Sequence, residues 1–123
     1  MPKPTPLDLS QNIDILSDWQ IHQRPRNPGA PTRINGMTMG FVTMQQSAPH
    51  NGEMHPDGDE LLYVISGKIS VVCDSAPDEP LVLGPGEGCI VPAGEWHKVD
   101  VVEPAQIIHM TPGPGGDHRP LRS

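Results

Sequence analysis

Two glutamates and two histidines stand at spacings that suit a single metal ion. Glu53 and His55 lie two positions apart, so on an extended chain their side chains project to the same side. The stretch 56–59 is typical of a turn, and Glu60 follows it at the start of a β-rich run, close enough to offer a third ligand. His97 follows a Pro-Ala-Gly turn further along the chain and is the fourth candidate.

The types of donor indicate which ion fits. Imidazole and carboxylate groups suit Fe, Mn, Ni and Zn, and two carboxylates would balance a 2+ charge. All four side chains together would leave one or two coordination positions for water or substrate. If Glu53 points away, His55, Glu60 and His97 form the two-histidine, one-carboxylate set of oxygen-activating iron enzymes. We therefore predict one divalent transition-metal ion, with the role of Glu53 left open.

Other histidines have weaker claims to a role. His50 could supply a further imidazole, but its five-residue offset from His55 breaks the alternation of a strand and requires a bulge. His109, near the end of the last β-rich run, either lines a cavity or is a hydrogen-bonded histidine of the core. The roles of His50 and His109 stay open, and His22 and His118 are assigned none.

Short β-rich runs must position these side chains. The chain has 13 glycines and 16 prolines among 123 residues, which leaves little room for long helices. The predicted strands are 37–44, 60–65, 68–73, 81–83, 89–91, 98–102 and 106–111. The predicted turns are 57–58, 66–67, 74–80, 84–86 and 93–94. Because no helical crossover separates the runs, the pattern predicts an antiparallel, all-β sandwich or small barrel.

Residues 47–101 resemble the cupins, a family of small β-barrels with two sequence motifs. The later part of the first motif, G-x5-H-x-H-x3,4-E-x6-G, is matched by His55, Glu60 and Gly67. The second motif, G-x5-P-x-G-x2-H-x3-N, is matched up to its histidine by Gly86, Pro92, Gly94 and His97. Three positions depart from the family: Ser47 replaces the opening glycine, Glu53 the first metal histidine and Val101 the closing asparagine.

The resemblance implies a single-domain, antiparallel jelly-roll β-barrel with a metal ion inside. We expect this barrel at residues 36–111, between an extended N-terminal arm at 1–35 and a flexible tail at 112–123. The arm is rich in proline, and its apolar cluster around Ile13 and Ile21 has a spacing that fits neither a clean helix nor a clean strand. Because that cluster could cover an exposed sheet edge of a second subunit, we predict a homodimer.

The predicted function is that of a mononuclear metal-binding cupin. We expect an enzyme that acts on a small oxygenated organic molecule, with oxygenase, isomerase and lyase or decarboxylase chemistry all compatible with the ligand set. The alternative is a non-catalytic barrel that binds or senses a small molecule. An enzyme should keep an open coordination position beside a proton-transfer group, whereas a binding module could lack both.

Charge and hydropathy argue against other classes of partner. The chain carries 15 acidic and 8 basic residues, and its net charge of −7 opposes binding to nucleic acid or to anionic lipid. No apolar stretch approaches the roughly 20 residues that span a bilayer, and residues 1–9 lack the apolar core of a signal peptide. We therefore predict a cytoplasmic protein whose partner is a small-molecule ligand or substrate.

Overall fold

The protein is all-β in the part of the chain that the computed structural model describes, which comprises residues 3–26, 33–47, 52–114 and 117–118. The strands described are β1 (Asn12–Leu16), β2 (Ile21–Arg24), β3 (Gly36–Met44), β4 (Glu53–Met54), β5 (Glu60–Cys73), β6 (Ala76–Leu83), β7 (Gly88–Val91), β8 (His97–Pro112) and β9 (Asp117–His118). All their pairings are antiparallel, which confirms the predicted fold class. Within these ranges, no helix has the length and apolar character needed to cross a membrane.

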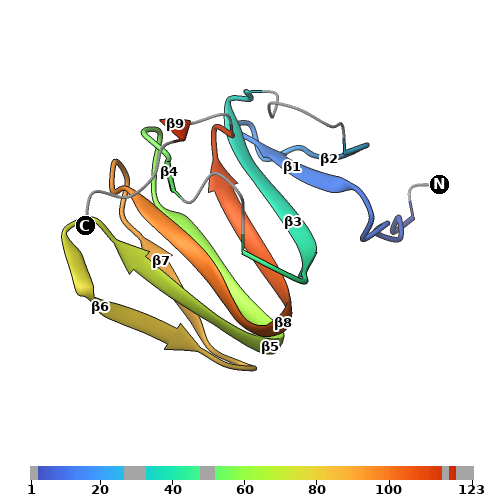
Figure 1. Ribbon diagram of the computed structural model, residues 1–123. Coiled ribbons are helices and arrows are strands. Elements are labelled where there is room, and N and C mark those ends of the chain that lie inside the picture. Colours follow the sequence, from blue (N-terminus) through green and yellow to red (C-terminus); the bar gives the residue numbers. More distant parts are fainter. Residues whose placement is uncertain (1–2, 27–32, 48–51, 115–116, 119–123) are drawn as a thin grey trace.

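The sheet is organised around β8 (Figure 1). This strand pairs with β3 along its C-terminal half and with β5 along most of its length. β1 and β2 continue the sheet beyond β3, whereas β6 and β7 both pair with β5. β4 pairs with the first residue of β8 and also with β9, a short strand inside the predicted tail. Glu53 lies on β4, His55 directly follows that strand, and Glu60 begins β5. These three candidate ligands are therefore on or next to strands that pair with β8.

β5 and β8 bend together at one corner of the barrel (Figure 1). Their register shifts between Val64 and Ile69, where β5 faces residues 101–107 of β8. The prediction of a turn at 66–67 between two separate strands was wrong, as was the division of β8 into runs 98–102 and 106–111. Bulges absorb the extra residues, so each strand continues through the corner and stays paired with the other.

β6 is longer than the sequence pattern indicated. The predicted turn at 74–80 was too long, because Cys73 already pairs with Ala76 and the chain reverses between them. Pro77 and Pro80 consequently lie inside a strand. In the described part of the chain β6 pairs with β5 alone, and proline is tolerated on such an edge because its missing N–H leaves no ladder bond broken.

The described part of the predicted N-terminal arm is mainly a β-hairpin, β1–β2, attached to β3. A polar cluster forms around the buried carboxylate of Asp14: Arg24 of the same hairpin donates to it at 2.6 and 3.0 Å, and the Thr38 hydroxyl of β3 donates to it at 2.8 Å. The guanidinium of Arg24 keeps the pKa of Asp14 below its ordinary value. The ion pair therefore stabilises the hairpin itself, and the hydrogen bond from Thr38 and the buried Ile13 join the hairpin to the barrel.

Alternation along β5 defines an inner and an outer face of the sheet. Glu60, Leu62 and Val64 are buried, whereas Leu61, Tyr63 and Ile65 are exposed. The core of the barrel is built from the inward residues Leu62, Val64, Ile69, Val71, Leu83, Val91, Ala105 and Ile107. Glu60 is on the same face of β5 as Leu62 and Val64, so its carboxylate is directed toward the interior.

Candidate metal centre

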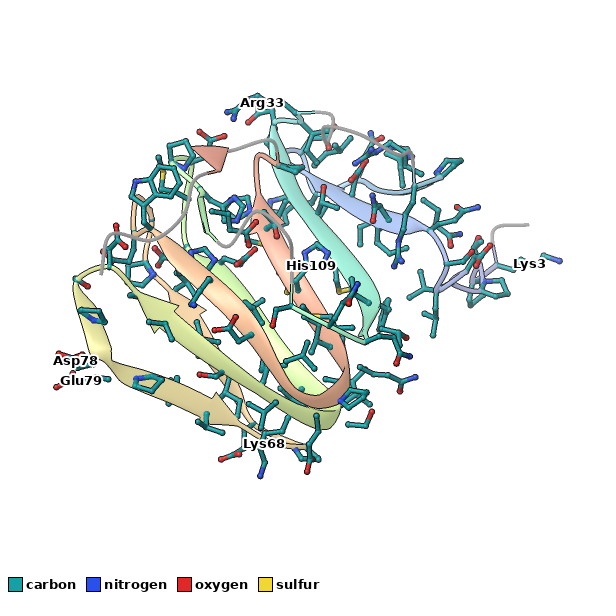
Figure 2. The ribbon with its side chains drawn as sticks, viewed as in Figure 1. Lys3, Arg33, Lys68, Asp78, Glu79 and His109 are labelled. Carbon is teal, nitrogen blue, oxygen red and sulfur yellow. The ribbon has the colours of Figure 1, made fainter. Side chains whose placement is uncertain are left out.

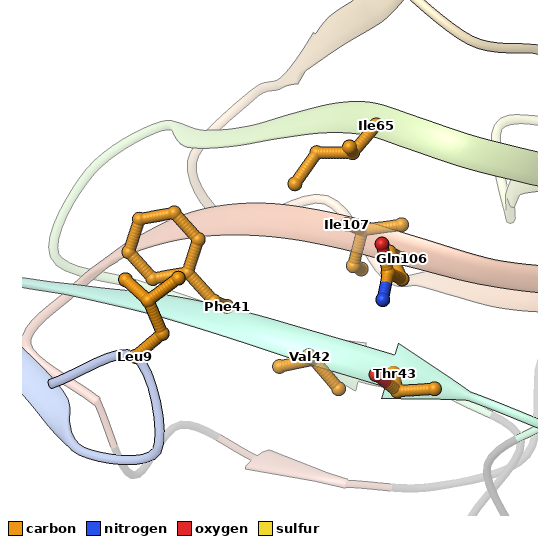
Figure 3. Close-up of a pocket in the computed structure, with 7 residues that line it drawn as sticks. All are labelled: Leu9, Phe41, Val42, Thr43, Ile65, Gln106 and Ile107. Atoms are coloured by element: carbon orange, nitrogen blue, oxygen red, sulfur yellow. The ribbon is translucent and has the colours of Figure 1, made fainter.

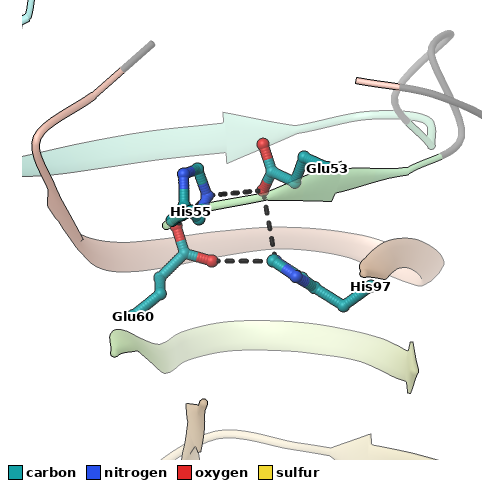
Figure 4. Close-up of side chains that lie close together, drawn as sticks. All are labelled: Glu53, His55, Glu60 and His97. Atoms are coloured by element: carbon teal, nitrogen blue, oxygen red, sulfur yellow. Dashed lines mark hydrogen bonds and ion pairs between the residues drawn. The ribbon is translucent and has the colours of Figure 1, made fainter. Parts of the chain in front are cut away.

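The four side chains singled out by the sequence meet at one point (Figure 4). His97 Nε2 lies 3.0 Å from Glu60 Oε1 and 3.4 Å from Glu53 Oε1. His55 Nε2 lies 3.2 Å from Glu60 Oε2 and 3.6 Å from Glu53 Oε1. One donor atom from each residue lies within 4.8 Å of the others, a spacing at which a single cation could contact all four.

Backbone pairing explains why residues so far apart in sequence converge. Glu53 is opposite His97 in the β4–β8 ladder. The Gly94 N–H donates to the His55 carbonyl at 3.0 Å, so the turn that precedes His97 is fastened to the segment that carries His55. Glu60 begins β5 with its side chain on the inner face. The site is therefore positioned by three strands and one turn of the barrel.

A backbone hydrogen bond sets the orientation of the His97 ring. Its Nδ1 lies 3.1 Å from the Glu95 carbonyl oxygen, which can only accept, so Nδ1 carries the proton. In the neutral ring, Nε2 then presents a lone pair to a Glu60 oxygen 3.0 Å away. Two acceptors at this distance require a proton or a cation between them, and His97 is completely buried.

The ring of His55 also requires a proton or a cation beside it. Its ring is buried, and although Nε2 lies 3.2 Å from Glu60 Oε2, neither Nδ1 nor Nε2 makes a well-aligned hydrogen bond to any residue that the structure describes. Buried polar atoms are almost always satisfied in native proteins. An ion bound at Nε2 would satisfy one of these atoms, so the donor set fits a divalent metal ion on structural grounds.

Electrostatic coupling within the cluster is strong. Burial alone would lower the histidine pKa values, but the carboxylates of Glu53 and Glu60 outweigh it and raise the pKa of His55 to about 9 and that of His97 to about 10. Burial would raise the carboxyl pKa values, yet the two imidazoles lower the pKa of Glu60 to about 2 and also hold that of Glu53 below its usual range. The site thus stabilises positive charge between its two carboxylates.

Of the two other candidate histidines, the structure describes only His109. His50 lies outside the described residues. His109 is on β8, and its Nδ1 is 2.8 Å from the hydroxyl of Thr111, which in turn donates to Glu60 at 2.7 Å. Sequence reasoning did not single out Thr111, although its two-residue spacing from His109 places both on one face of a strand.

Two departures from the family motifs are in direct contact. The Ser47 hydroxyl accepts a hydrogen bond of 3.0 Å from the backbone N–H of Val101. Ser47 stands where the first motif has glycine, and Val101 where the second has asparagine. The serine side chain therefore connects the segment after β3 to β8, at a distance of 54 residues in the sequence.

Comparisons with known proteins agree with this architecture. The sequence pattern of the family described as "Cupin domain" matches residues 40–111. A cupin-2 domain containing protein from Shewanella frigidimarina is 23% identical, with a TM-score of 0.55 over 70% of this chain and 79% of that chain. A variant of oxalate decarboxylase from B. subtilis is 20% identical, with a TM-score of 0.53 over 69% of this chain and 24% of that chain.

A third structure is that of hydroquinone 1,2-dioxygenase from Sphingomonas sp. TTNP3 with 4-hydroxybenzoate bound. It is 15% identical, with a TM-score of 0.52 over 64% of this chain and 61% of that chain. At these levels of identity the three structures establish the fold and leave the reaction of this chain undetermined.

Proposed function

Because this chain belongs to the cupin family, we propose that it is a mononuclear metal-dependent enzyme that acts on a small oxygenated organic molecule. Glu53, His55, Glu60 and His97 would hold one Fe, Mn, Ni or Zn ion. Such an ion would act as a Lewis acid toward a carbonyl or enediol, or bind dioxygen beside a chelated substrate. The observation that carries this proposal is the convergence of two imidazoles and two carboxylates on one buried point.

The chain's own residues would prepare the site for such a ligand. Buried Leu62 and Val64 lie on the same face of β5 as Glu60, so apolar walls adjoin the charged cluster and exclude water. In that environment, attraction between the ion and an anionic oxygen is stronger than in water. Two of the similar structures are named for reactions of oxalate and hydroquinone, and we extend that class of small oxygenated substrate to this chain.

The open coordination position can be tested with cobalt. We expect the protein loaded with one equivalent of Co²⁺ to show visible d–d bands, and to change them saturably when oxalate, lactate or catechol is added. Glu53→Gln should alter the starting spectrum if Glu53 is a ligand and leave it unchanged in the three-ligand alternative. A spectrum that none of the three compounds alters would contradict the enzyme and favour the non-catalytic barrel.

We also propose that the protein is a homodimer that packs through the outer face of its sheet. Exposed apolar residues of neighbouring strands collect on this face, among them Leu61, Tyr63, Ile65 and Ile90. A hollow of about 190 Å³ lies beside Ile65, which lines it together with Leu9, Phe41 and the polar Gln106 (Figure 3). By strand alternation this face is opposite to the metal cluster, so the two features do not compete.

Light scattering tests the dimer. We expect a mass of twice the 13.3 kDa of one chain, and dissociation when Tyr63→Glu and Ile90→Glu place charges on the outer face. The double substitution Asp78→Lys and Glu79→Lys on exposed β6 is the control and should leave the mass unchanged. A wild-type mass equal to that of a single chain would overturn the dimer proposal.

A further inference from the structure

A chain of hydrogen bonds leads from the proposed metal site to His109. The Thr111 hydroxyl donates to Glu60 Oε2 at 2.7 Å, and the same hydroxyl oxygen lies 2.8 Å from His109 Nδ1. His109 is opposite Leu62 in the β5–β8 ladder, which places it on the inner face next to Glu60. Figure 2 shows His109 near the middle of the view, whereas the labelled charged side chains extend from the periphery.

The direction of these bonds assigns the tautomer of His109. An ionised Glu60 carboxylate only accepts hydrogen bonds, so the single hydroxyl proton of Thr111 is committed to it. The hydroxyl oxygen must then accept from Nδ1 of His109. In the neutral imidazole, Nε2 consequently keeps its lone pair. Burial is the main influence on the ring and lowers the pKa of His109, in keeping with a neutral side chain.

The opposite strand is shaped to admit the ring. Gly40 pairs with His109 in the β3–β8 ladder. A Cβ at position 40 would collide with His109 Nε2 and lie 3.0 Å from its Cδ2, which is too close for a side-chain carbon. The φ of Gly40 is not in the left-handed region, so the glycine is required for space rather than for conformation. The position of the ring is therefore limited by Thr111 on one side and by β3 on the other.

We propose that His109 is a positioning residue for the metal centre, acting through Thr111 to hold Glu60 in the orientation that binds the ion. With Oε2 held by Thr111, Glu60 directs Oε1 toward His97, 3.0 Å away. This inference rests on the proposed function, because Thr111 and His109 would orient a ligand of the same ion. Outer-shell partners of this kind fix the orientation and basicity of metal ligands.

Metal affinity is one test of the proposal. Thr111→Val keeps the shape of the side chain but removes the hydroxyl, and we expect it to weaken Zn²⁺ binding by about 10–100-fold, as does His109→Leu. Thr111→Ser keeps the hydroxyl, and His109→Asn keeps an N–H donor. Both variants should therefore recover most of the affinity for Zn²⁺. Gly40→Ala should act like His109→Leu, because it displaces the ring without touching a ligand. Wild-type affinity in folded Thr111→Val, as judged by circular dichroism, would overturn the proposal.

The tautomer provides a readout that does not depend on metal. Nitrogen-15 NMR of the metal-free wild-type protein should show a protonated Nδ1 and an unprotonated Nε2 for His109, with this signature lost in Thr111→Val. Protonation at Nε2, or a doubly protonated ring at neutral pH, would refute the hydrogen-bond chain. If the wild-type protein shows the expected tautomer but binds no Zn²⁺, the proposed function and the metal-positioning role fail together, while the orientation of His109 stands.

Discussion

Replacing His97 with alanine is expected to remove high-affinity metal binding. The loss should exceed the roughly 10–100-fold cost of removing an outer-shell partner, because a ligand itself is lost. His97 contributes a completely buried nitrogen that contacts both carboxylates of the cluster. Without it Glu53 and Glu60 face each other with only His55 between them, and their mutual repulsion opposes the folded site.

Competitive titration against a chromophoric zinc chelator measures this change. His22→Ala is the matched control, since His22 lies on β2 with an exposed side chain. The control should bind Zn²⁺ like the wild-type protein. Equal affinities for His97→Ala and the wild-type protein, with both shown to be folded, would mean that the cluster is not where metal binds.

Replacing Gly67 with alanine is expected to destabilise the barrel more than any other single glycine substitution proposed here. Gly67 has φ +80° at the corner where β5 and β8 bend together, and a Cβ there would lie 2.6 Å from Cα of Ala105 and collide with the carbonyl of Pro104. An alanine in this left-handed region costs about 1–2 kcal/mol of unfolding free energy. Because the colliding atoms belong to backbone that is fixed in the β8 ladder, we expect a total loss of at least ~3 kcal/mol of unfolding free energy.

Gly86 separates the two contributions to this loss. It has nearly the same φ, +82°, but a Cβ at this position meets no atom within 4 Å. Gly86→Ala should therefore show only the conformational penalty of the left-handed region, about 1–2 kcal/mol. Urea unfolding measures both variants. If the two substitutions cost the same, close packing at the corner is not what makes glycine necessary at position 67.

The candidate site was largely predictable because local rules govern it. Two-residue alternation places Glu53 and His55 on one side of the chain, and the motif spacings connect them with Glu60 and His97. The structure brings all four together. Thr111 escaped prediction because its contact with Glu60, 51 residues away in sequence, depends on the register between β8 and β5. No local pattern reports such a register.

The errors in the strand assignments have a related cause. At 66–67 the sequence has the composition of a turn, but β5 and β8 both bulge there and their pairing continues. In β1 the side chain of Asp14 is buried, which contradicts the usual pattern of polar residues facing solvent. Its partner Arg24 lies ten residues away and Thr38 lies 24 away, so only the folded hairpin makes that burial favourable.

The metal content of the purified protein tests the central claim most directly. The wild-type chain would be produced without added ions, purified without chelators and analysed by inductively coupled plasma mass spectrometry beside His97→Ala. We expect one divalent transition-metal ion per wild-type chain, either as isolated or after incubation with Fe, Mn, Ni and Zn followed by gel filtration, and a metal-free variant. A wild-type protein that remains as free of metal as the variant under all these conditions would contradict the account.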